Sequence, residues 1–171
     1  MTTITIEPAK AGNSLTDSCQ PEILKALTIP ADAWDSEEAK ARIPVQPSVD
    51  SSYVFDPDTT GEVVEYLYEG QGALLTGAPG AGKTSVVAQV CARQNIPLFQ
   101  FTCSAESTLE QLCGHEGLVN GTTQFVPGPL AQACDAASHI RGGLATKAVL
   151  LLAELDAASP AIVVGLTNSL D

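Results

Sequence analysis

The octet at residues 77–84, Gly-Ala-Pro-Gly-Ala-Gly-Lys-Thr, constrains the fold of this chain more than any other segment. It meets the pattern G-x-x-x-x-G-K-[ST], in which the glycines let consecutive backbone N–H groups converge on one phosphate. A helix that begins at the octet directs its positive end at the same point. Because such a loop needs a strand before it and a helix after it, the octet predicts those three elements in that order.

The octet also predicts the roles of the side chains around it. Lys83 is expected to reach the β- and γ-phosphates of a nucleotide, which makes it a catalytic candidate, and the Thr84 hydroxyl is expected to ligate Mg²⁺. The sequence therefore predicts ATP and Mg²⁺ as cofactors. The predicted nucleotide-binding residues are Gly77, Ala78, Pro79, Gly80, Ala81, Gly82, Lys83, Thr84 and Ser85.

The segments around the octet have the periodicity that this loop requires. Short apolar runs predict buried strands at residues 73–76, 97–102 and 148–152. Helical spacing of apolar residues predicts helices at residues 85–93 and 129–140. Strands that alternate with helices favour a parallel sheet. The predicted fold class is therefore α/β, a P-loop NTPase three-layer sandwich with a parallel sheet between helices.

Local signals predict the other elements of this half of the chain. The Asn120-Gly121 pair between apolar flanks predicts a hairpin over residues 117–126. Ser107 and Glu110 have the spacing of a capping box, which predicts that a helix begins there. Two further helices are predicted, one at residues 60–69, capped by Asp58 or Thr59, and one at residues 160–170.

The first part of the chain has a different texture. Residues 1–50 are rich in Pro, Ser, Asp and Ala and have no long periodic segment, so an extended arm with short helices at residues 21–27 and 31–42 is expected. Prolines at positions 44 and 47 mark a linker. The predicted division is an arm over residues 1–50 and a nucleotide-binding domain over residues 51–171.

Net charge, hydropathy and cysteine spacing argue against several kinds of partner, location and site. Residues 1–70 hold 13 acids and 4 bases, and the net charge of the chain is −12, so direct binding of nucleic acid is disfavoured. No apolar run is long enough for a membrane span or an export signal, which favours a cytoplasmic protein. The five cysteines contain no CxxC pair, so neither a disulfide framework nor a zinc site is predicted.

Four segments carry a resemblance to a known family. They are SYVFDPDTT at residues 52–60, LCG at residues 112–114, FVPGPL at residues 125–130 and LLLAELDAASP at residues 150–160. Together with the octet, they make residues 43–171 similar to AAA+ ATPases of the MoxR group, and most closely to the ATPase subunit of aerobic cobalt chelatase. The resemblance implies ATP hydrolysis, a homo-oligomeric ring or a partner subunit, and remodelling of a client protein that the sequence does not identify.

The chain departs from the family at the end of its third strand. The resemblance implies an Asp-Glu pair there, whereas this chain has Ala153 and Glu154. The family's Asp orders Mg²⁺, and Ala153 has no side-chain oxygen for that role, while Glu154 remains as the catalytic residue that orients the attacking water. Asp156 is an alternative metal ligand. The departure predicts that nucleotide binding survives while turnover falls.

A second departure is the number of strands. The resemblance implies five strands in the order 5-1-4-3-2 and a helical lid, and this chain ends before strands 4 and 5, so an incomplete AAA+ core is expected. The absent strand 4 would leave residues 73–76 and 148–152 with unpaired edges across a gap. The alternating segment at residues 2–6 and a partner chain are two alternatives for supplying a strand.

Several other residues have both an ordinary and a functional interpretation. For Tyr53 and Phe55, core packing is favoured over stacking on adenine. Arg93 and Arg141 match no arginine-finger motif, so surface or capping roles are expected. The hairpin either contacts a client or closes the domain edge.

Three functions are compatible with the octet. The first is an ATP-dependent remodelling module, and the second is a subunit that binds nucleotide, hydrolyses it weakly or not at all and serves assembly only. The third, a small-molecule kinase, is disfavoured because the chain has no Arg-rich lid.

Overall fold

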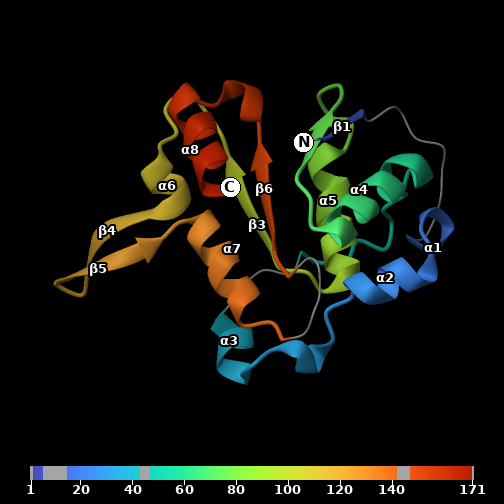
Figure 1. Ribbon diagram of the computed structural model, residues 1–171, viewed down its shortest axis with the longest axis horizontal. Helices are drawn as coiled ribbons and strands as arrows, with labels where there is room; N and C mark the ends of the chain where they lie inside the picture. The colour runs from blue at the N-terminus through green and yellow to red at the C-terminus, as the bar shows by residue number, and fades with distance from the viewer. Residues whose placement is uncertain (1, 6–14, 43–46, 142–146, 171) are drawn as a thin grey trace.

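The computed structural model describes residues 2–5, 15–42, 47–141 and 147–170 (Figure 1). The elements in chain order are β1 (Thr2–Thr5), α1 (Leu15–Ser18), α2 (Pro21–Leu27), the 3-10 helix η1 (Ala31–Ala33), α3 (Glu37–Arg42), α4 (Pro57–Glu69), β2 (Ala73–Thr76), α5 (Lys83–Gln94), β3 (Leu98–Thr102), α6 (Leu109–Cys113), β4 (Gly114–Val119), β5 (Thr122–Pro127), α7 (Pro129–Ser138), β6 (Val149–Ala153), the 3-10 helix η2 (Leu155–Ala157) and α8 (Pro160–Leu170). The predicted α/β class, with parallel strands flanked by helices, is confirmed. The linker proline at position 44 lies outside the described residues.

The strand before the octet pairs with a strand near the N-terminus of the chain. Strand β1 pairs in parallel with β2, with Thr2 opposite Ala73 and Thr5 opposite Thr76. The alternating segment near the N-terminus therefore forms a strand, but among the described strands it pairs with β2 alone and does not join β2 to β6 as the missing central strand would.

Strands β3 and β6 form a second parallel pair, in which Leu98 lies opposite Val149 and Thr102 lies opposite Ala153. Among the described strands, no ladder joins β2 to β6. The parallel strands therefore form two separate pairs. Figure 1 shows that β2, β3 and β6 all run toward the same edge of the molecule, where their carboxyl ends lie.

Helices cover both faces of these strands. On one face, Val87 and Val90 of α5 belong to a core cluster that also contains Leu75 of β2 and Leu151 of β6. On the other face, Leu150 and Leu152 of β6 pack in a cluster with α6 and α8, whose buried members are Leu112, Ile162 and Leu166. Helix α5 therefore contacts residues of both strand pairs.

The first 42 residues also contribute to this core. Leu15, Leu27 and Trp34 are buried in the same cluster as α5. The division of the chain at residue 50 stays a prediction. The single helix expected over residues 31–42 is wrong, because η1 and α3 are separate and the Ser36 hydroxyl accepts from Ala39 N at 3.1 Å to begin α3.

Two predicted helix starts are shifted. Asp56, not Asp58 or Thr59, caps α4, and its carboxylate accepts from Thr59 N at 3.0 Å. The capping box before α6 uses Thr108 and Gln111 rather than Ser107 and Glu110. The box lies one residue later than predicted because the Ser107 hydroxyl already accepts from Ser104 N at 2.9 Å.

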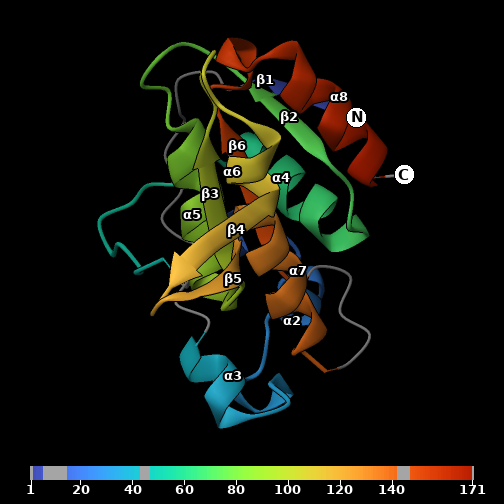
Figure 2. The same ribbon diagram turned by 90° about the vertical axis from the view of Figure 1, so that its left-hand side faces the viewer.

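The predicted hairpin is confirmed. Asn120 and Gly121 have φ values of 53° and 80°, as the two central residues of a type I′ turn require. Strands β4 and β5 extend away from the rest of the molecule in Figure 1, and in the rotated view of Figure 2 they lie in front of it, toward the viewer.

Candidate functional site

The loop between β2 and α5 has an open backbone with conformations that favour glycine. Gly80 and Gly82 have φ values of 77° and 86°, which L-residues rarely adopt. A Cβ placed on either glycine would meet no atom within 4 Å, so the space over the loop is open. The loop thus offers an open backbone surface where the octet predicted a phosphate site.

The start of α5 leaves donors available at that surface. Its N-cap is Gly82, and no side chain caps the helix there. The N–H groups of the first helical turn have no partner within the helix, and the helix dipole adds positive charge at this end. Farther along, Val86 and Val90 are buried in the core, which holds the helix in position against β2. The N–H groups of the first turn and the positive end of the helix dipole therefore favour the binding of an anion at the start of α5.

The ammonium group of Lys83 lies back over the loop. Its Nζ donates to the carbonyl oxygens of Gly77 at 2.9 Å and Ala78 at 3.0 Å. Thr84 and Ser85 follow it on the exposed start of the helix, so their hydroxyls are open to solvent. One cation and two hydroxyls therefore lie within one helical turn beside the open backbone.

The end of β6 contrasts with this loop. Ala153 is the last residue of the strand, and its carbonyl accepts from Cys103 N at 2.8 Å. Glu154 follows with φ 53° and ψ 43°, a left-handed conformation that costs an L-residue about 1–2 kcal/mol. The sequence gave no signal of this backbone conformation.

The predicted site residues thus lie in two places. Residues 77–85 lie together at the end of β2, whereas Glu154 lies at the end of β6, on the other strand pair but at the same edge (Figure 1). Asp156 is exposed in η2, beyond the strand. The carboxyl ends of parallel strands are where open α/β folds bind ligands.

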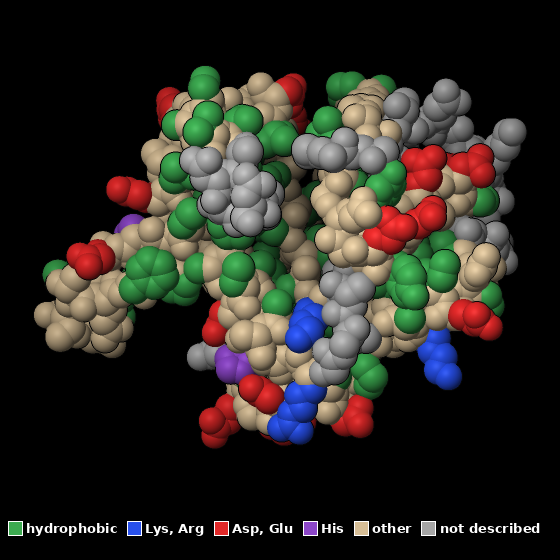
Figure 3. All heavy atoms as spheres, viewed as in Figure 1, with side chains coloured by type: hydrophobic (Ala, Val, Ile, Leu, Met, Phe, Trp, Pro, Cys, Tyr) green, Lys and Arg blue, Asp and Glu red, His purple; other side chains and the backbone are tan. Residues whose placement is uncertain are grey.

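The two strand pairs are separated by a hollow. Figure 3 shows it between the two sides of the molecule, with hydrophobic side chains along it. All residues of β2 and β6 are partly exposed, although an apolar strand such as β6 would be buried inside a continuous sheet. The unpaired edges expected from the strand count are therefore present among the described residues.

The aromatic residues before α4 lie far from the octet. Phe55 is fully buried, and the Arg93 guanidinium stacks over its ring at 4.7 Å. Arg93 is near the end of α5, about 15 Å along the helix from Lys83 at 1.5 Å per residue. Phe55 therefore has the packing role that the sequence favoured, and Arg93 fixes the preceding segment by donating to Asp50 O at 2.8 Å.

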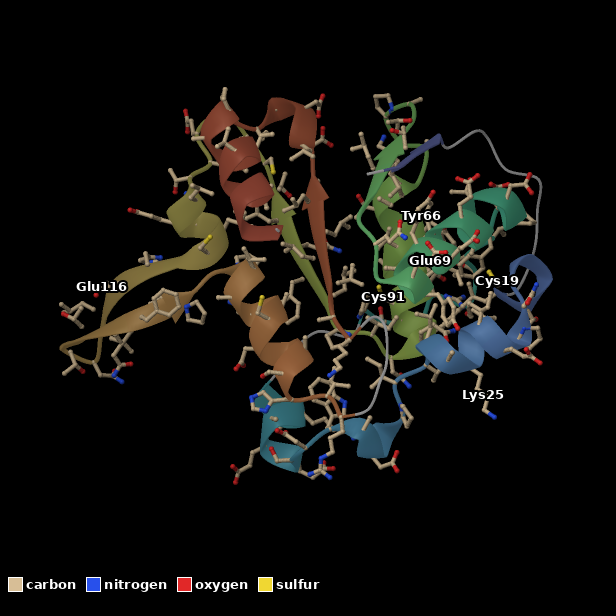
Figure 4. All side chains as sticks on the ribbon, in the orientation of Figure 1. Cys19, Lys25, Tyr66, Glu69, Cys91 and Glu116 are labelled. Atoms are coloured by element: carbon tan, nitrogen blue, oxygen red, sulfur yellow. The ribbon has the colours of Figure 1, made fainter. Side chains whose placement is uncertain are left out.

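The described cysteines are all free, but they differ in environment. Burial raises the pKa of Cys91 to about 12, so this thiol stays protonated at neutral pH. Figure 4 shows it inside the molecule, near α4. Cys134, by contrast, is exposed.

Comparison with known proteins adds one match. A family model described as AAA domain (dynein-related subfamily) matches residues 72–171, which is more than half of the chain. A search of curated proteins finds no match. Within the described residues, no helix has both the length and the apolar character needed to cross a bilayer.

Proposed function

The chain belongs to the AAA domain family, in its dynein-related subfamily, and from this premise we propose that it binds MgATP at residues 77–85. A nucleotide-binding ATPase module is what the family match supports. The observation that carries the proposal is the open glycine backbone joined to the uncapped start of α5. Backbone N–H groups at a helix start form a preorganised seat for phosphate.

Different groups of the loop would bind the phosphates and the Mg²⁺ ion. The amides of residues 77–85 would hold the phosphates, and Lys83 would exchange its two carbonyl partners for phosphate oxygens. The Thr84 hydroxyl would hold Mg²⁺, which neutralises charge on the phosphate oxygens when bound. Binding of MgATP in this way requires no movement of the core, because the side chains that hold α5 in position are already buried.

Glu154 is the residue that we assign to hydrolysis. It is exposed at the same edge of the molecule as the loop, and its carboxylate would orient the attacking water. Its left-handed backbone supports the assignment, because strain of this kind concentrates at functional sites.

We propose further that the module works in a homo-oligomeric ring or with a partner subunit and remodels a client, as the resemblance to the MoxR group and to cobalt chelatase implies. The alternative is a subunit that binds nucleotide with little or no hydrolysis and serves assembly. Ala153 favours this alternative, because the last residue of β6 has no side-chain oxygen to order the metal.

Measuring ATP affinity and phosphate release on the same preparation separates the two. A remodelling ATPase shows binding with steady release of phosphate. An assembly subunit shows binding with release no faster than that of a Glu154→Gln variant. Neither function holds if ATP with Mg²⁺ does not bind.

A further inference from the structure

A segment of the N-terminal part connects the two sides of the molecule at the end opposite the nucleotide loop. We call residues 28–36 the strap. At one end, Ile29 N donates to Gln94 O at 2.9 Å and the Thr28 hydroxyl donates to Gln94 Oε1 at 2.6 Å, which fixes the strap to the end of α5. At the other end, Trp34 forms an antiparallel bridge with Ile140, just after α7. Figure 1 shows the strap passing below both sides.

The contact between the strap and the end of α7 is made by backbone and side chains together. Asp35 N donates to His139 O at 2.9 Å, and Arg141 N donates to Ala33 O at 2.7 Å. The Arg141 guanidinium also donates to Asp35 O at 2.9 Å. Trp34 is only 8% exposed there, so a loosened strap would uncover it.

The imidazole of His139 has a carboxylate on each side. Its Nδ1 lies 2.8 Å from Asp35 Oδ2, across the contact, and its Nε2 lies 3.5 Å from Asp135 Oδ1, one helical turn earlier on α7. A neutral imidazole has a single N–H donor, so it can donate to only one of these carboxylates, whereas an imidazolium donates to both. The contact with Asp35 is the one that crosses to the strap, and it becomes a charge-assisted ion pair when the ring is protonated.

Charged groups of both signs surround the ring. Hydrogen bonding to His139 is the first cause that lowers the pKa of Asp35, and Arg141 lowers it further. Asp35 thus stays ionised well below neutrality. Glu37 and Glu38 at the start of α3 add negative charge on the strap side. Histidines titrate around pH 6.5, far above these carboxylates.

We propose that His139 is a pH-sensitive latch that holds the strap on α7. When protonated, the ring donates to Asp35 and Asp135 together and ties the strap down. When neutral, it loses the positive charge that attracts Asp35 across the contact, and the strap opens more often. Acidification thus tightens the connection between the two sides of the molecule, and this holds whether or not the nucleotide loop is active.

The chain provides its own reporter for this latch, because Trp34 is its only tryptophan. As pH rises from 6 to 8 through the ordinary histidine range, Trp34 emission should move to longer wavelengths. Exchange of the Arg141 amide, corrected for its intrinsic pH dependence, should rise roughly two- to five-fold, as expected for a partly exposed ion pair. His139→Gln should remove both changes, because an amide does not titrate.

The matched control is His115→Gln, since His115 is the only other histidine and lies on the β4–β5 hairpin. This variant should retain the full pH response. If His139→Gln fails to fold, Asp135→Asn serves instead, because Asp135 is half exposed and its loss should shrink the response. A wild-type protein without a pH response would overturn the proposal, and so would His139→Gln or Asp135→Asn with an unchanged one.

Discussion

The end of β2 and the end of β6 lie at the same edge of one molecule, yet they are equipped very differently. The β2 end has an open glycine backbone, an uncapped helix, Lys83 and two exposed hydroxyls. The β6 end has Ala153, which has no polar side chain, and an exposed Glu154 in a left-handed conformation. Under the proposed function, nucleotide binding and hydrolysis would depend on separate strand pairs, so one could weaken while the other persists.

The sharpest test of this comparison supplies the carboxylate that the β6 end lacks. Ala153→Asp should raise Mg²⁺-dependent ATP turnover, by roughly 10²-fold if the electrostatic contribution is fully restored. Affinity for ATP should change little, because the loop is untouched. Phosphate release measures the effect, with Ala157→Asp in η2 as a control that adds the same charge elsewhere. Equal turnover in both variants would contradict the role proposed for position 153.

The role of the β2 end in ATP binding is tested by removing the positive charge of Lys83. Lys83→Ala should weaken ATP binding roughly 10- to 100-fold, the expected loss for hydrogen bonds to a charged group. Calorimetric titration with ATP and Mg²⁺ measures it. Lys25→Ala on α2 is a suitable control, because Lys25 is exposed and points away from the molecule in Figure 4. If Lys83→Ala binds as tightly as Lys25→Ala, the loop is not the phosphate site.

The strain at Glu154 can be separated from its carboxylate. Glu154→Gly should stabilise the protein by about 1 kcal/mol, because glycine adopts positive φ without the penalty of an L-residue. Glu154→Gln keeps the strained backbone and should leave the free energy of unfolding near that of the wild type. Both variants should lose turnover equally. Chemical denaturation compares them, and equal stabilities would argue against backbone strain at the β6 end.

The smallest expected effect concerns the strap, far from both strand ends. The pKa of Asp35 is lowered in the folded state, first by its hydrogen bond to His139. Its stabilising contribution is therefore complete above the ordinary aspartate range and is lost as pH falls through the lower folded value. Asp35→Asn should flatten the decline of the urea midpoint below about pH 4. Asp32→Asn, an exposed neighbour, should follow the wild type, and an Asp35→Asn curve that also does so would exclude this contribution.

The sequence predicted the features that depend on local patterns. The octet, its strand and its helix follow from spacing, and the Asn120-Gly121 turn follows from the positive φ that both residues adopt. Ambiguity arose where two patterns overlap: Ser107 with Glu110 and Thr108 with Gln111 both fit a capping box. The local hydrogen bond from Ser104 N, which occupies the Ser107 hydroxyl, decides between them.

Long-range pairings could not be predicted in this way. Nothing near Asp35 indicates that its partner is His139, 104 residues later. The pairing of β1 with β2 was open for the same reason, because alternation identifies a strand but not its neighbour. The left-handed backbone of Glu154 was missed because Glu rarely adopts it, and no glycine or asparagine marked the position.

The most direct test of the account records the backbone amide resonances while ATP and Mg²⁺ are added. Binding at the end of β2 predicts that the largest shifts cluster at residues 77–85, with smaller ones at Glu154. In the Lys83→Ala variant, the shifts should appear only at higher ATP concentration. An unchanged spectrum at millimolar ATP, or shifts centred on the β4–β5 hairpin or the strap, would contradict a phosphate site on this loop.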